Sequence, residues 1–534
     1  MRYFLAGPLA LAAALASLPP SRAEACGCFA PPSPAEPVVQ AGERILFAVN
    51  DGVVTAHIQI QYVGSASEFA WLVPLPSVPK LKLGNDDVFN ELEKATAPSF
   101  LFDSSGTFCG GGGFGCGSAD SAFANDSGPK PMSPAVIVSS VGPYDYAVVK
   151  ADSKQPMLDW LNDNRFFVPT GTEGAIDPYI HEGAYFLALR LRSGQAAGDL
   201  VPIVLEYESD LPMIPIILTS VASAPNLGIL VWVLGEQRAV PRNYQHVLVN
   251  HERINWSGQA SNYAEVVAQA IDEADDHHAF ITEYAGPSAP MVGILDAPDR
   301  FPQRSQLEGI SRARSYFVEL YNHEAINWRQ LQAIVQRHYG NPDALSTVTD
   351  RELFFEQLYR YSETDAATLL YDPLTLTDEI WERMVTPSLE AGQLFRELPK
   401  LTRLYTVLSP EEMTEDPVFG FNADLPDVPR QHAAYLSRDC DDADAPTYLS
   451  LEDGRVVESF GGGVSPDGSP IPAASQVQVL GMEGQPQVIR SVGVTTEDAG
   501  GCSSNSARNR GAGDLILIFA SVFSLRAWNR RRRA

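Results

Sequence analysis

The sequence has little positive charge for its length. Its 534 residues carry 38 lysines and arginines against 66 aspartates and glutamates, which gives a formal net charge of −28. Nucleic-acid binding needs basic side chains gathered on one face, so this balance argues against a nucleic-acid partner. With 45% hydrophobic residues, the chain is long enough to bury more than one core. We therefore expect two or three domains with a solvated, acidic surface.

Complete catalytic motifs are also missing. No G-x-S-x-G is present, and the glycine-rich loop at 110–113 is not followed by Gly-Lys-Ser/Thr. Ser77 and Lys80 match Ser-x-x-Lys, but Pro79 prevents the helical turn that would aim the lysine at the serine. The sequence thus gives no support for a nucleophilic or a nucleotide-dependent enzyme.

Two similar heptapeptides contain half of a zinc motif. NHERINW at 250–256 and NHEAINW at 322–328 are identical at six of seven positions. Their His251-Glu252 and His323-Glu324 steps match the start of H-E-x-x-H, in which a second histidine one helical turn later completes the metal site. Asparagine occupies that later position in both copies, and a neutral amide is a poor zinc ligand. A capping or packing role is therefore expected.

Two further polar clusters have simple explanations. His277 and His278 follow two aspartates at a predicted helix end, where a positive imidazolium is electrostatically favoured. An acidic run around Cys440 would offer oxygen ligands to calcium, but it lacks the glycine and the closing glutamate of an EF-hand. We assign no cofactor and no metal residue, and keep calcium as an alternative for that run, which comprises Asp439, Asp441, Asp442 and Asp444.

Long hydrophobic runs are absent, and the two short ones lie at the ends of the chain. Residues 1–25 combine Arg2, an apolar stretch at 5–18 and the small-residue site Ala23-Glu24-Ala25, which predicts a secretory signal peptide. Residues 515–525 are apolar apart from two serines, but at ~1.5 Å per residue they span only about half of a ~30 Å hydrocarbon layer. The arginines that follow would stop transfer and stay on the cytoplasmic side.

The C-terminus resembles a known sorting signal. Gly501-Cys502-Ser503-Ser504, a polar spacer, the short apolar run and a terminal arginine cluster are similar to the tripartite C-terminal signal of myxobacterial surface proteins. The resemblance implies that Cys502 is the processing or anchoring point. It also implies that the basic end of the signal is formed by Arg530, Arg531, Arg532 and Arg533.

Six cysteines in an exported chain predict disulfides. Cys26 and Cys28 lie at the mature N-terminus, while Cys109 and Cys116 bracket GGGGFG. Either the N-terminal pair is joined to this loop or Cys109 joins Cys116. A zinc site from the same four thiols is a weaker alternative, because zinc sites prefer two to four residues between paired thiols. With Cys502 reserved for the anchor, one thiol is left unpaired or intermolecular.

Periodicity predicts an α+β fold, in which a mixed or antiparallel β-sandwich-like N-terminal domain precedes a mainly helical domain. TAHIQIQYV alternates as a half-buried strand does, and 86–95 has a helical apolar stripe. Among the strands expected between 135 and 250 is MIPIILTSVAS. Later helices are expected at 262–274, where Asn262 and Glu265 form a capping pair, and at 311–339, 350–361 and 377–398.

The predicted organisation has five parts. They are a signal peptide at 1–25, a β-rich α+β domain with the Cys/Gly loop at 26–256, a mainly helical domain at 257–430, an acidic Gly/Pro-rich stalk with one hairpin-like piece, TYLSLEDGRVVES, at 431–501, and a sorting and anchor segment at 502–534.

Several phrases, in order between about 25 and 430, resemble a bacterial domain-of-unknown-function family, the one numbered twenty-three thirty. They include ACGCFAPP, EFAWLVPLPSVP, LVWVLGEQRAVPRNYQHV and LSPEEMTEDPVF. The resemblance implies an exported envelope protein without an established activity, and it offers no catalytic residues to carry over.

The expected function is that of a membrane-anchored cell-surface protein that binds envelope components or has a structural role, without enzymatic activity and with an unknown ligand. The alternative is a secreted carboxylate-dependent or metal-dependent hydrolase acting on envelope polymers. Two facing acids in a pocket would favour the hydrolase, whereas a flat polar surface with an apolar groove would favour the binding protein.

Overall fold

The structure is a computed structural model of the chain. It describes residues 39–63, 69–103, 135–166, 168, 171, 173–192, 200–297, 299–339, 345, 348–438, 447–458 and 470–491. Several residues of the sequence predictions lie outside these ranges: the signal peptide, Cys26, Cys28, Cys109, Cys116, the acidic run around Cys440, Cys502 and the terminal arginines. No helix among the described residues is both long enough and apolar enough to cross a membrane.

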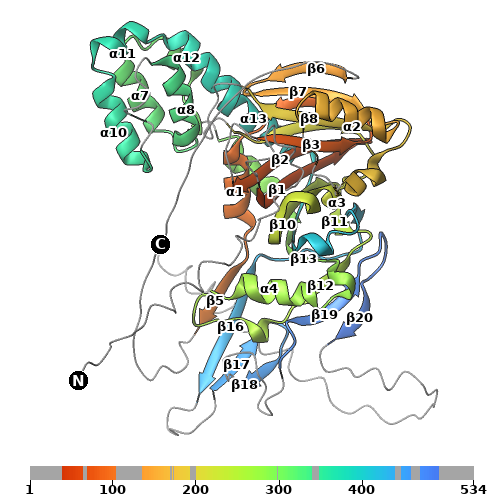
Figure 1. The fold of residues 1–534 in the computed structure, drawn as a ribbon. Coiled ribbons are helices and arrows are strands. Elements are labelled where there is room, and N and C mark those ends of the chain that lie inside the picture. Colours follow the sequence, from red (N-terminus) through yellow and green to blue (C-terminus); the bar gives the residue numbers. More distant parts are fainter. Residues whose placement is uncertain are drawn as a thin grey trace, which may run out of the picture. The chain divides into compact units, whose positions relative to one another are not determined.

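A ten-stranded mixed sheet forms the centre of the described chain (Figure 1). Its order is β20-β19-β12-β13-β14-β10-β1-β2-β9-β4. Within this sheet, only β1 with β10 and β12 with β13 pair in parallel. The strands are β1 (Val39–Asn50), β2 (Val53–Val63), β4 (Lys80–Leu83), β9 (Ile203–Glu208), β10 (Ser223–Gly235), β12 (Gln245–Val249), β13 (Ala279–Pro287), β14 (Lys400–Leu408), β19 (Ala474–Val479) and β20 (Gln487–Ser491).

A second, antiparallel sheet packs on one face of β1 and β2, which confirms the predicted sandwich. Because side chains alternate along a strand, Ile45 and Phe47 of β1 face the same way and meet Trp71 and Leu187 of the second sheet. This sheet has the order β3 (Ala70–Leu75), β8 (Tyr185–Leu191), β7 (Tyr144–Lys150) and β6 (Ala135–Val141), and α2 (Lys154–Asp163) and η2 (Glu173–Tyr179) add to its core.

Three helices cover the opposite face of β1 and β10. They are α1 (Asp86–Thr96), α5 (Ala289–Leu295) and α13 (Thr386–Glu397). Phe89 and Leu92 of α1 are fully buried against Leu46 and Trp232, as the apolar stripe predicts. The N-terminus of α1 is fixed by Asn85, whose Oδ1 accepts the Asp87 N–H at 3.1 Å.

In the lower half of Figure 1, the strands β12, β13, β14 and β19 of the ten-stranded sheet pack against α4 (Tyr263–Asp272) and a small third sheet. Val266, Val267, Ala270 and Ile271 form the buried stripe of α4 as predicted. Asn262 precedes the helix but its side chain does not cap it, so the predicted capping pair is wrong. The third sheet has the order β18 (Val456–Glu458), β17 (Thr447–Leu451), β16 (Gln431–Arg438) and β5 (Ser99–Asp103).

A helical segment with its own core lies between β13 and β14 in the sequence. The helix expected at 311–339 is two helices separated by the second heptapeptide, and the stretch at 377–398 includes a π-helical turn. The elements of this core are α6 (Arg304–Glu308), α7 (Ala313–Tyr321), α8 (Trp328–His338), α10 (Arg351–Tyr361), α11 (Asp365–Leu370), α12 (Pro373–Ile380) and η7 (Trp381–Val385).

The strand expected at MIPIILTSVAS is wrong. Apart from an isolated bridge at Met213, the segment forms α3 (Ile216–Thr219) and η4 (Ser220–Ala222), because Pro215 at the cap position starts a helical turn instead of extending a strand. The remaining short elements are β11 (Arg238–Pro241), η5 (His251–Arg253), η6 (Asp275–His277), η8 (Pro410–Glu412) and β15 (Phe419–Asn422).

The segments on either side of the expected domain boundaries share sheets. Residues 257–430 contribute the strands β13, β14 and β15 as well as helices. The described part of 431–501 contains the expected β17–β18 hairpin, and in addition β16 pairs with β5 while β19 pairs with β12. The described part of this segment therefore consists of strands that pair with strands from earlier in the chain, in addition to any spacer.

Candidate functional site

Three adjoining hollows open around the end of the β1–β2 pair and share Gln61. Arg44 of β1 lies opposite Gln59 of β2 in the antiparallel register. Because Ile45 and Ile58 face the sandwich core, alternation turns Arg44 and Gln59 to the helix-covered face. Polar side chains thus emerge beside α1, where the apolar packing of the sheet ends.

The largest hollow, which we call the Asp86 hollow, has a volume of about 760 Å³. Arg44, Gln59 and Gln61 line it on the sheet, and the first turns of α1 line another side. Part of the second heptapeptide also borders it, together with three arginines. These further lining residues are Ala325, Ile326, Asn327, Trp328, Arg300, Arg329 and Arg351.

Asp86 is a half-buried carboxyl of this hollow. Its Oδ1 accepts a hydrogen bond from Gln59 Nε2 at 2.5 Å and its Oδ2 accepts one from Gln330 Nε2 at 3.3 Å. Burial raises the pKa of Asp86 to about 6, although the Gln59 hydrogen bond and the charge of Arg44 act in the opposite direction. The group therefore titrates close to neutral pH.

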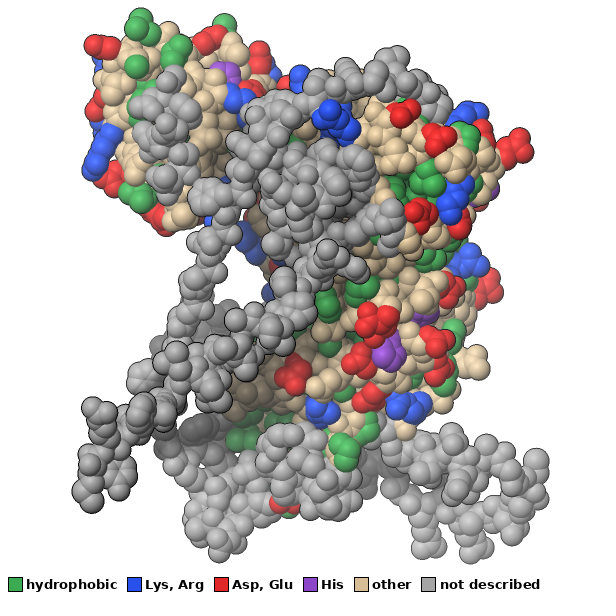
Figure 2. Space-filling view, viewed as in Figure 1, with side chains coloured by type: hydrophobic (Ala, Val, Ile, Leu, Met, Phe, Trp, Pro, Cys, Tyr) green, Lys and Arg blue, Asp and Glu red, His purple; other side chains and the backbone are tan. Residues whose placement is uncertain are grey.

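Most other charges in the Asp86 hollow are paired. Arg300 donates to Asp87 and lies 3.7 Å from Glu91, and Lys94 lies 3.0 Å from Glu91. The guanidinium of Arg44, in contrast, makes no hydrogen bond or ion pair to another residue within the described ranges. On the face in Figure 2, acidic and basic side chains are interspersed. Arg44 influences Asp86 through its charge but donates no hydrogen bond to a described residue, which distinguishes this hollow from the general surface.

Some of the buried polar atoms that lack a partner lie in the same hollows. Within the part of the chain that the structure describes, Gln59 Oε1 and Arg300 Nε of the Asp86 hollow have no hydrogen-bond partner. The same is true of Trp71 Nε1, which lines the small neighbouring hollow of about 170 Å³. Buried donors and acceptors are normally satisfied, so these three atoms indicate that solvent or a ligand completes the site.

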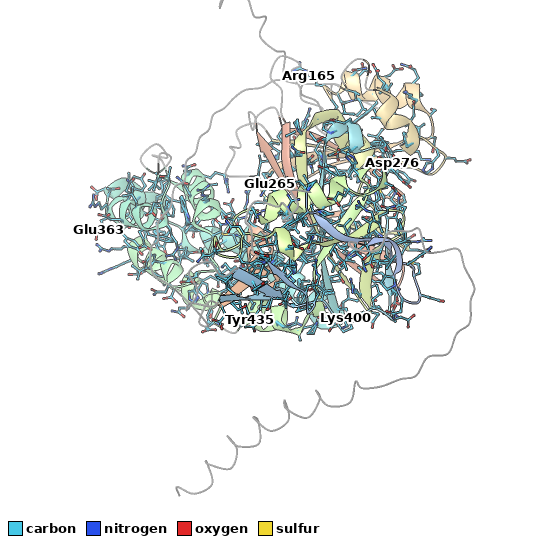
Figure 3. The ribbon with its side chains drawn as sticks, turned by 90° about the horizontal axis from the view of Figure 1, so that it is seen from below. Arg165, Glu265, Asp276, Glu363, Lys400 and Tyr435 are labelled. Carbon is cyan, nitrogen blue, oxygen red and sulfur yellow. The ribbon has the colours of Figure 1, made fainter. Side chains whose placement is uncertain are left out.

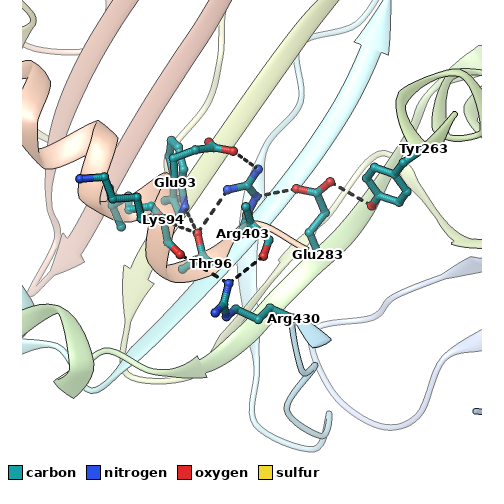
Figure 4. A network of polar contacts seen from close by, with 10 residues as sticks. Glu93, Lys94, Thr96, Tyr263, Glu283, Arg403 and Arg430 are labelled. Carbon is teal, nitrogen blue, oxygen red and sulfur yellow. Dashed lines mark hydrogen bonds and ion pairs between the residues drawn. The ribbon is translucent and has the colours of Figure 1, made fainter. Parts of the chain in front are cut away.

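The third hollow, the Arg403 hollow, has a volume of about 550 Å³ and borders a buried ion-pair network (Figure 4). Arg403 donates to Glu283 through Nε and to Glu93 through NH2 at 3.0 Å, and its guanidinium lies 5.3 Å from the ring centre of Trp232. Tyr263 donates to Glu283 at 2.9 Å. Although burial acts to lower the pKa of Arg403, these carboxylates hold the pKa above its usual value. The charge of Arg403 is therefore already matched.

Glu43 is buried beneath the Arg403 hollow. It accepts a hydrogen bond from Gln40 Nε2 at 3.1 Å. Burial raises the pKa of Glu43 to about 7, and the Gln40 hydrogen bond reduces this effect. No local pattern in the sequence distinguishes Glu43 or Asp86 from the many exposed acids, because their burial depends on strands and helices that meet only in the folded chain.

The predicted packing and capping roles of the two heptapeptides are observed, but at different positions. In the first copy, Asn250 Oδ1 accepts the Glu252 N–H at 3.2 Å and Trp256 Nε1 donates to the His251 carbonyl at 2.9 Å. In the second copy, Asn327 caps α8 by accepting the Arg329 N–H at 3.0 Å. The similar sequences therefore serve two unrelated turns.

The other candidate residues have structural partners. Ser77 Oγ accepts the Glu208 N–H at 3.0 Å, and Lys80 pairs with Glu206, so the pair is not arranged for nucleophilic chemistry. His277 Nδ1 lies 2.5 Å from Glu412 Oε1. His278 Nε2 lies 2.8 Å from the Glu412 carbonyl, and its ring stacks on Tyr244 at 4.7 Å. Both histidines thus hold η8 against η6.

Two groups of described side chains have the spacing of metal ligands. One is His251, His432 and Glu452, and the other is Asp272, His277 and Glu412. Burial, helped by His432 and Arg455, lowers the pKa of His251 to about 4. The second imidazole that the heptapeptide lacks is thus supplied by β16, which sequence spacing does not reveal.

The family described as "Uncharacterized protein conserved in bacteria (DUF2330)" matches residues 20–307. The chain belongs to this family. The DUF2330 match includes Arg44, Gln59, Asp86 and Arg300 of the Asp86 hollow, whereas Arg403 and His432 lie after its end. No curated protein and no solved structure matches the chain.

Proposed function

We propose that this DUF2330 protein binds a small organic acid carrying hydroxyl or amino groups in the Asp86 hollow. We further propose that it does so at the cell surface, as an exported protein anchored through its C-terminus. The observation that carries the binding proposal is Arg44, which donates no hydrogen bond to a described residue, beside buried polar atoms without partners. A folded protein seldom retains such a combination unless a ligand or ordered solvent occupies the site.

The chemistry of the hollow indicates the groups that a ligand needs. Arg44 offers paired N–H donors to a carboxylate or phosphate, which is the strongest kind of hydrogen bond available to it. Gln59 Oε1 is a free acceptor, and ionised Asp86 can accept further donors, so hydroxyl or amino groups suit this side of the hollow. An acidic sugar, such as those found in envelope polymers, has both features.

The test compares an acidic sugar with its neutral counterpart. We expect glucuronate to bind the full-length protein and glucose to bind much more weakly in isothermal titration calorimetry. Arg44→Gln should weaken glucuronate binding roughly tenfold to a hundredfold, the loss of one charge-assisted hydrogen-bonding group. Arg165→Gln is the matched control, because Arg165, which is labelled in Figure 3, is exposed and does not line the Asp86 hollow. Equal affinities of the wild-type and Arg44→Gln proteins for glucuronate, or no binding, would refute the proposal.

A carboxylate-dependent hydrolase is the second candidate, and the titration of Asp86 near neutral pH favours it. A carboxyl with such a pKa can act as a general acid. The experiment is a turnover screen of the purified protein on envelope polysaccharides and peptidoglycan, repeated with Asp86→Asn. Turnover that Asp86→Asn abolishes would establish the hydrolase, whereas binding without turnover favours the binding protein.

Export and anchoring rest on the signal peptide, Cys502 and the terminal arginines of the sequence. We expect wild-type protein in the membrane fraction and on the cell surface. Cys502→Ser, or replacement of the four terminal arginines by glutamine, should release or misplace it. Unchanged surface retention of both variants in fractionation and surface labelling would contradict this part of the proposal.

A further inference from the structure

We propose that His251, His432 and Glu452 bind a divalent transition-metal ion, with Zn²⁺ as the best-suited ion. One ligand atom from each side chain lies within 4.8 Å of the other two. The proposal is independent of ligand binding in the Asp86 hollow, because none of these three residues lines that hollow.

Three separate elements bring the ligands together. His251 opens η5 directly after β12, and His432 lies on β16 opposite Phe100 of β5. Glu452 lies in the tight turn that ends β17, in which the Gly454 N–H donates to the Leu451 carbonyl at 3.1 Å. Gly454 has a φ of +85°, a conformation that glycine adopts at little cost. The turn is thereby held in place beside β16.

Aromatic packing fixes the two imidazoles before any ion arrives. The rings of His251 and His432 lie 4.6 Å apart between centres, edge to face. Phe100 contacts both, with centre distances of 6.2 Å and 5.4 Å, and Trp256 packs on His251 at 6.0 Å. Rings held in this way lose little side-chain freedom when they bind a metal.

The donor set and the distances favour a transition metal. Two imidazoles and one carboxylate form a ligand set used by zinc, with a fourth position left for water. Calcium and magnesium prefer oxygen donors throughout. Ligand atoms around a tetrahedral zinc ion lie roughly 3.4 Å apart, given metal–ligand distances of about 2.0–2.2 Å. His432 Nδ1 and Glu452 Oε2 are already 3.2 Å apart, and the His251 ligand atom lies within 4.8 Å of both.

The other group of three differs in ways that make it a suitable control. Glu412 Oε2 accepts the Ser409 N–H at 2.6 Å as part of a capping box, and its Oε1 contacts His277. Asp272 is exposed. Glu452 of the proposed site likewise accepts the Ala433 N–H, so the two groups differ in their donors. The control group has one imidazole and two carboxylates, whereas the proposed site has two imidazoles and one carboxylate.

The experiment measures metal binding to the untagged full-length protein. We expect Zn²⁺ and Co²⁺ to bind and to raise the unfolding temperature, with Ca²⁺ having no such effect. His432→Ala should weaken Zn²⁺ binding by more than the roughly 10- to 100-fold that the loss of a supporting residue costs. His277→Ala should leave it unchanged. The Co²⁺ spectrum should lack thiolate charge-transfer bands, which would otherwise identify cysteine ligands.

A second variant guards against misfolding. Glu452→Gln keeps the size of the side chain while removing the carboxylate, and should also weaken Zn²⁺ binding, with an unchanged far-ultraviolet circular dichroism spectrum. Wild-type affinity in both His432→Ala and Glu452→Gln, or thiolate bands in the Co²⁺ spectrum, would overturn the assignment.

Discussion

Glu283 lies at a register shift of β13, beside Tyr284, which is paired with Arg403 of β14, and the Glu283 carboxylate accepts a hydrogen bond from Arg403 Nε. The shift falls between Thr282 and Tyr284, as in a β-bulge, where an extra residue re-aims a side chain. Arg403 and Glu283 are each only 5% exposed, so neither charge is solvated by bulk water. The register shift of β13 and the buried charge pair therefore coincide at Glu283.

Removal of one partner of this pair should be strongly destabilising. Glu283→Gln leaves the buried Arg403 without its closest negative charge, and we expect a loss of about 3–5 kcal/mol in the free energy of unfolding. Urea denaturation measures it. The double variant Glu283→Gln, Arg403→Met should be less destabilised than Glu283→Gln alone, because no unpaired buried arginine remains and Glu93, which then loses its partner, is partly exposed.

The control for this prediction is an exposed pair. Lys80 and Glu206 also form an ion pair, but the Lys80 side chain is 75% exposed. Lys80→Met should therefore change the free energy of unfolding by less than about 1 kcal/mol. Similar losses in Lys80→Met and Glu283→Gln would show that burial is not what gives the Arg403 pair its importance.

Local patterns predicted the elements whose burial repeats at regular intervals. Ile45 and Phe47 recur every second residue, and Phe89 and Leu92 lie one helical turn apart, so the β-sandwich and α1 follow from the sequence. The strand predicted at MIPIILTSVAS was wrong. The β-branched residues of this segment favour a strand, but Pro215 at the cap position starts a helical turn.

The candidate sites depend on contacts between distant parts of the chain. Asp86 accepts hydrogen bonds from Gln59 and Gln330, and His251 meets its second imidazole only because β16 pairs with β5. Asn262 was predicted as a cap, yet its amide donates to the Arg253 carbonyl at 2.8 Å. Such choices among competing partners are made by the topology, which hydrophobic periodicity does not contain.

Glu43 should make stability depend on pH in a defined direction. Burial raises its pKa from 4.5 to about 7. The folded protein therefore holds this proton more tightly than the unfolded chain does. The resulting stabilisation is complete below pH 4.5 and is lost as the pH rises through about 7. Its magnitude is on the order of 3 kcal/mol.

The difference between wild type and Glu43→Gln isolates this effect. His57 and His246, whose pKa values burial lowers to about 4 and about 3, destabilise both proteins equally at low pH. Urea unfolding from pH 4.5 to pH 8 should show wild type losing stability relative to Glu43→Gln as the pH rises. Parallel profiles would mean that Glu43 does not titrate in this range.

Asn250, the first residue of NHERINW, should contribute more to stability than Asn327, the second asparagine of NHEAINW. Asn250 is fully buried, donates to the Pro472 carbonyl at 2.9 Å and accepts from Arg455 at 3.1 Å. Asn250→Ala leaves these groups unpaired, and we expect a cost of about 3 kcal/mol. Asn327→Ala removes only a helix cap, at a cost of about 1 kcal/mol. Equal losses in chemical denaturation would contradict this ranking.

The strands β19 and β20, near the end of the described chain, should be needed for stability and not only to connect the fold to the C-terminal segment. Ala473, Ala474 and Val477 are buried in the core that β12 and α4 share, and β19 is hydrogen-bonded to β12. A chain truncated after Arg438 loses these contacts and leaves β12 as an open sheet edge, so we expect it to aggregate or to unfold at a much lower temperature. A chain truncated after Ser491 keeps both β19 and β20 and should unfold at the wild-type temperature. Because both truncations remove the sorting segment, an equally stable shorter chain would mean that residues 439–491 act only as a spacer.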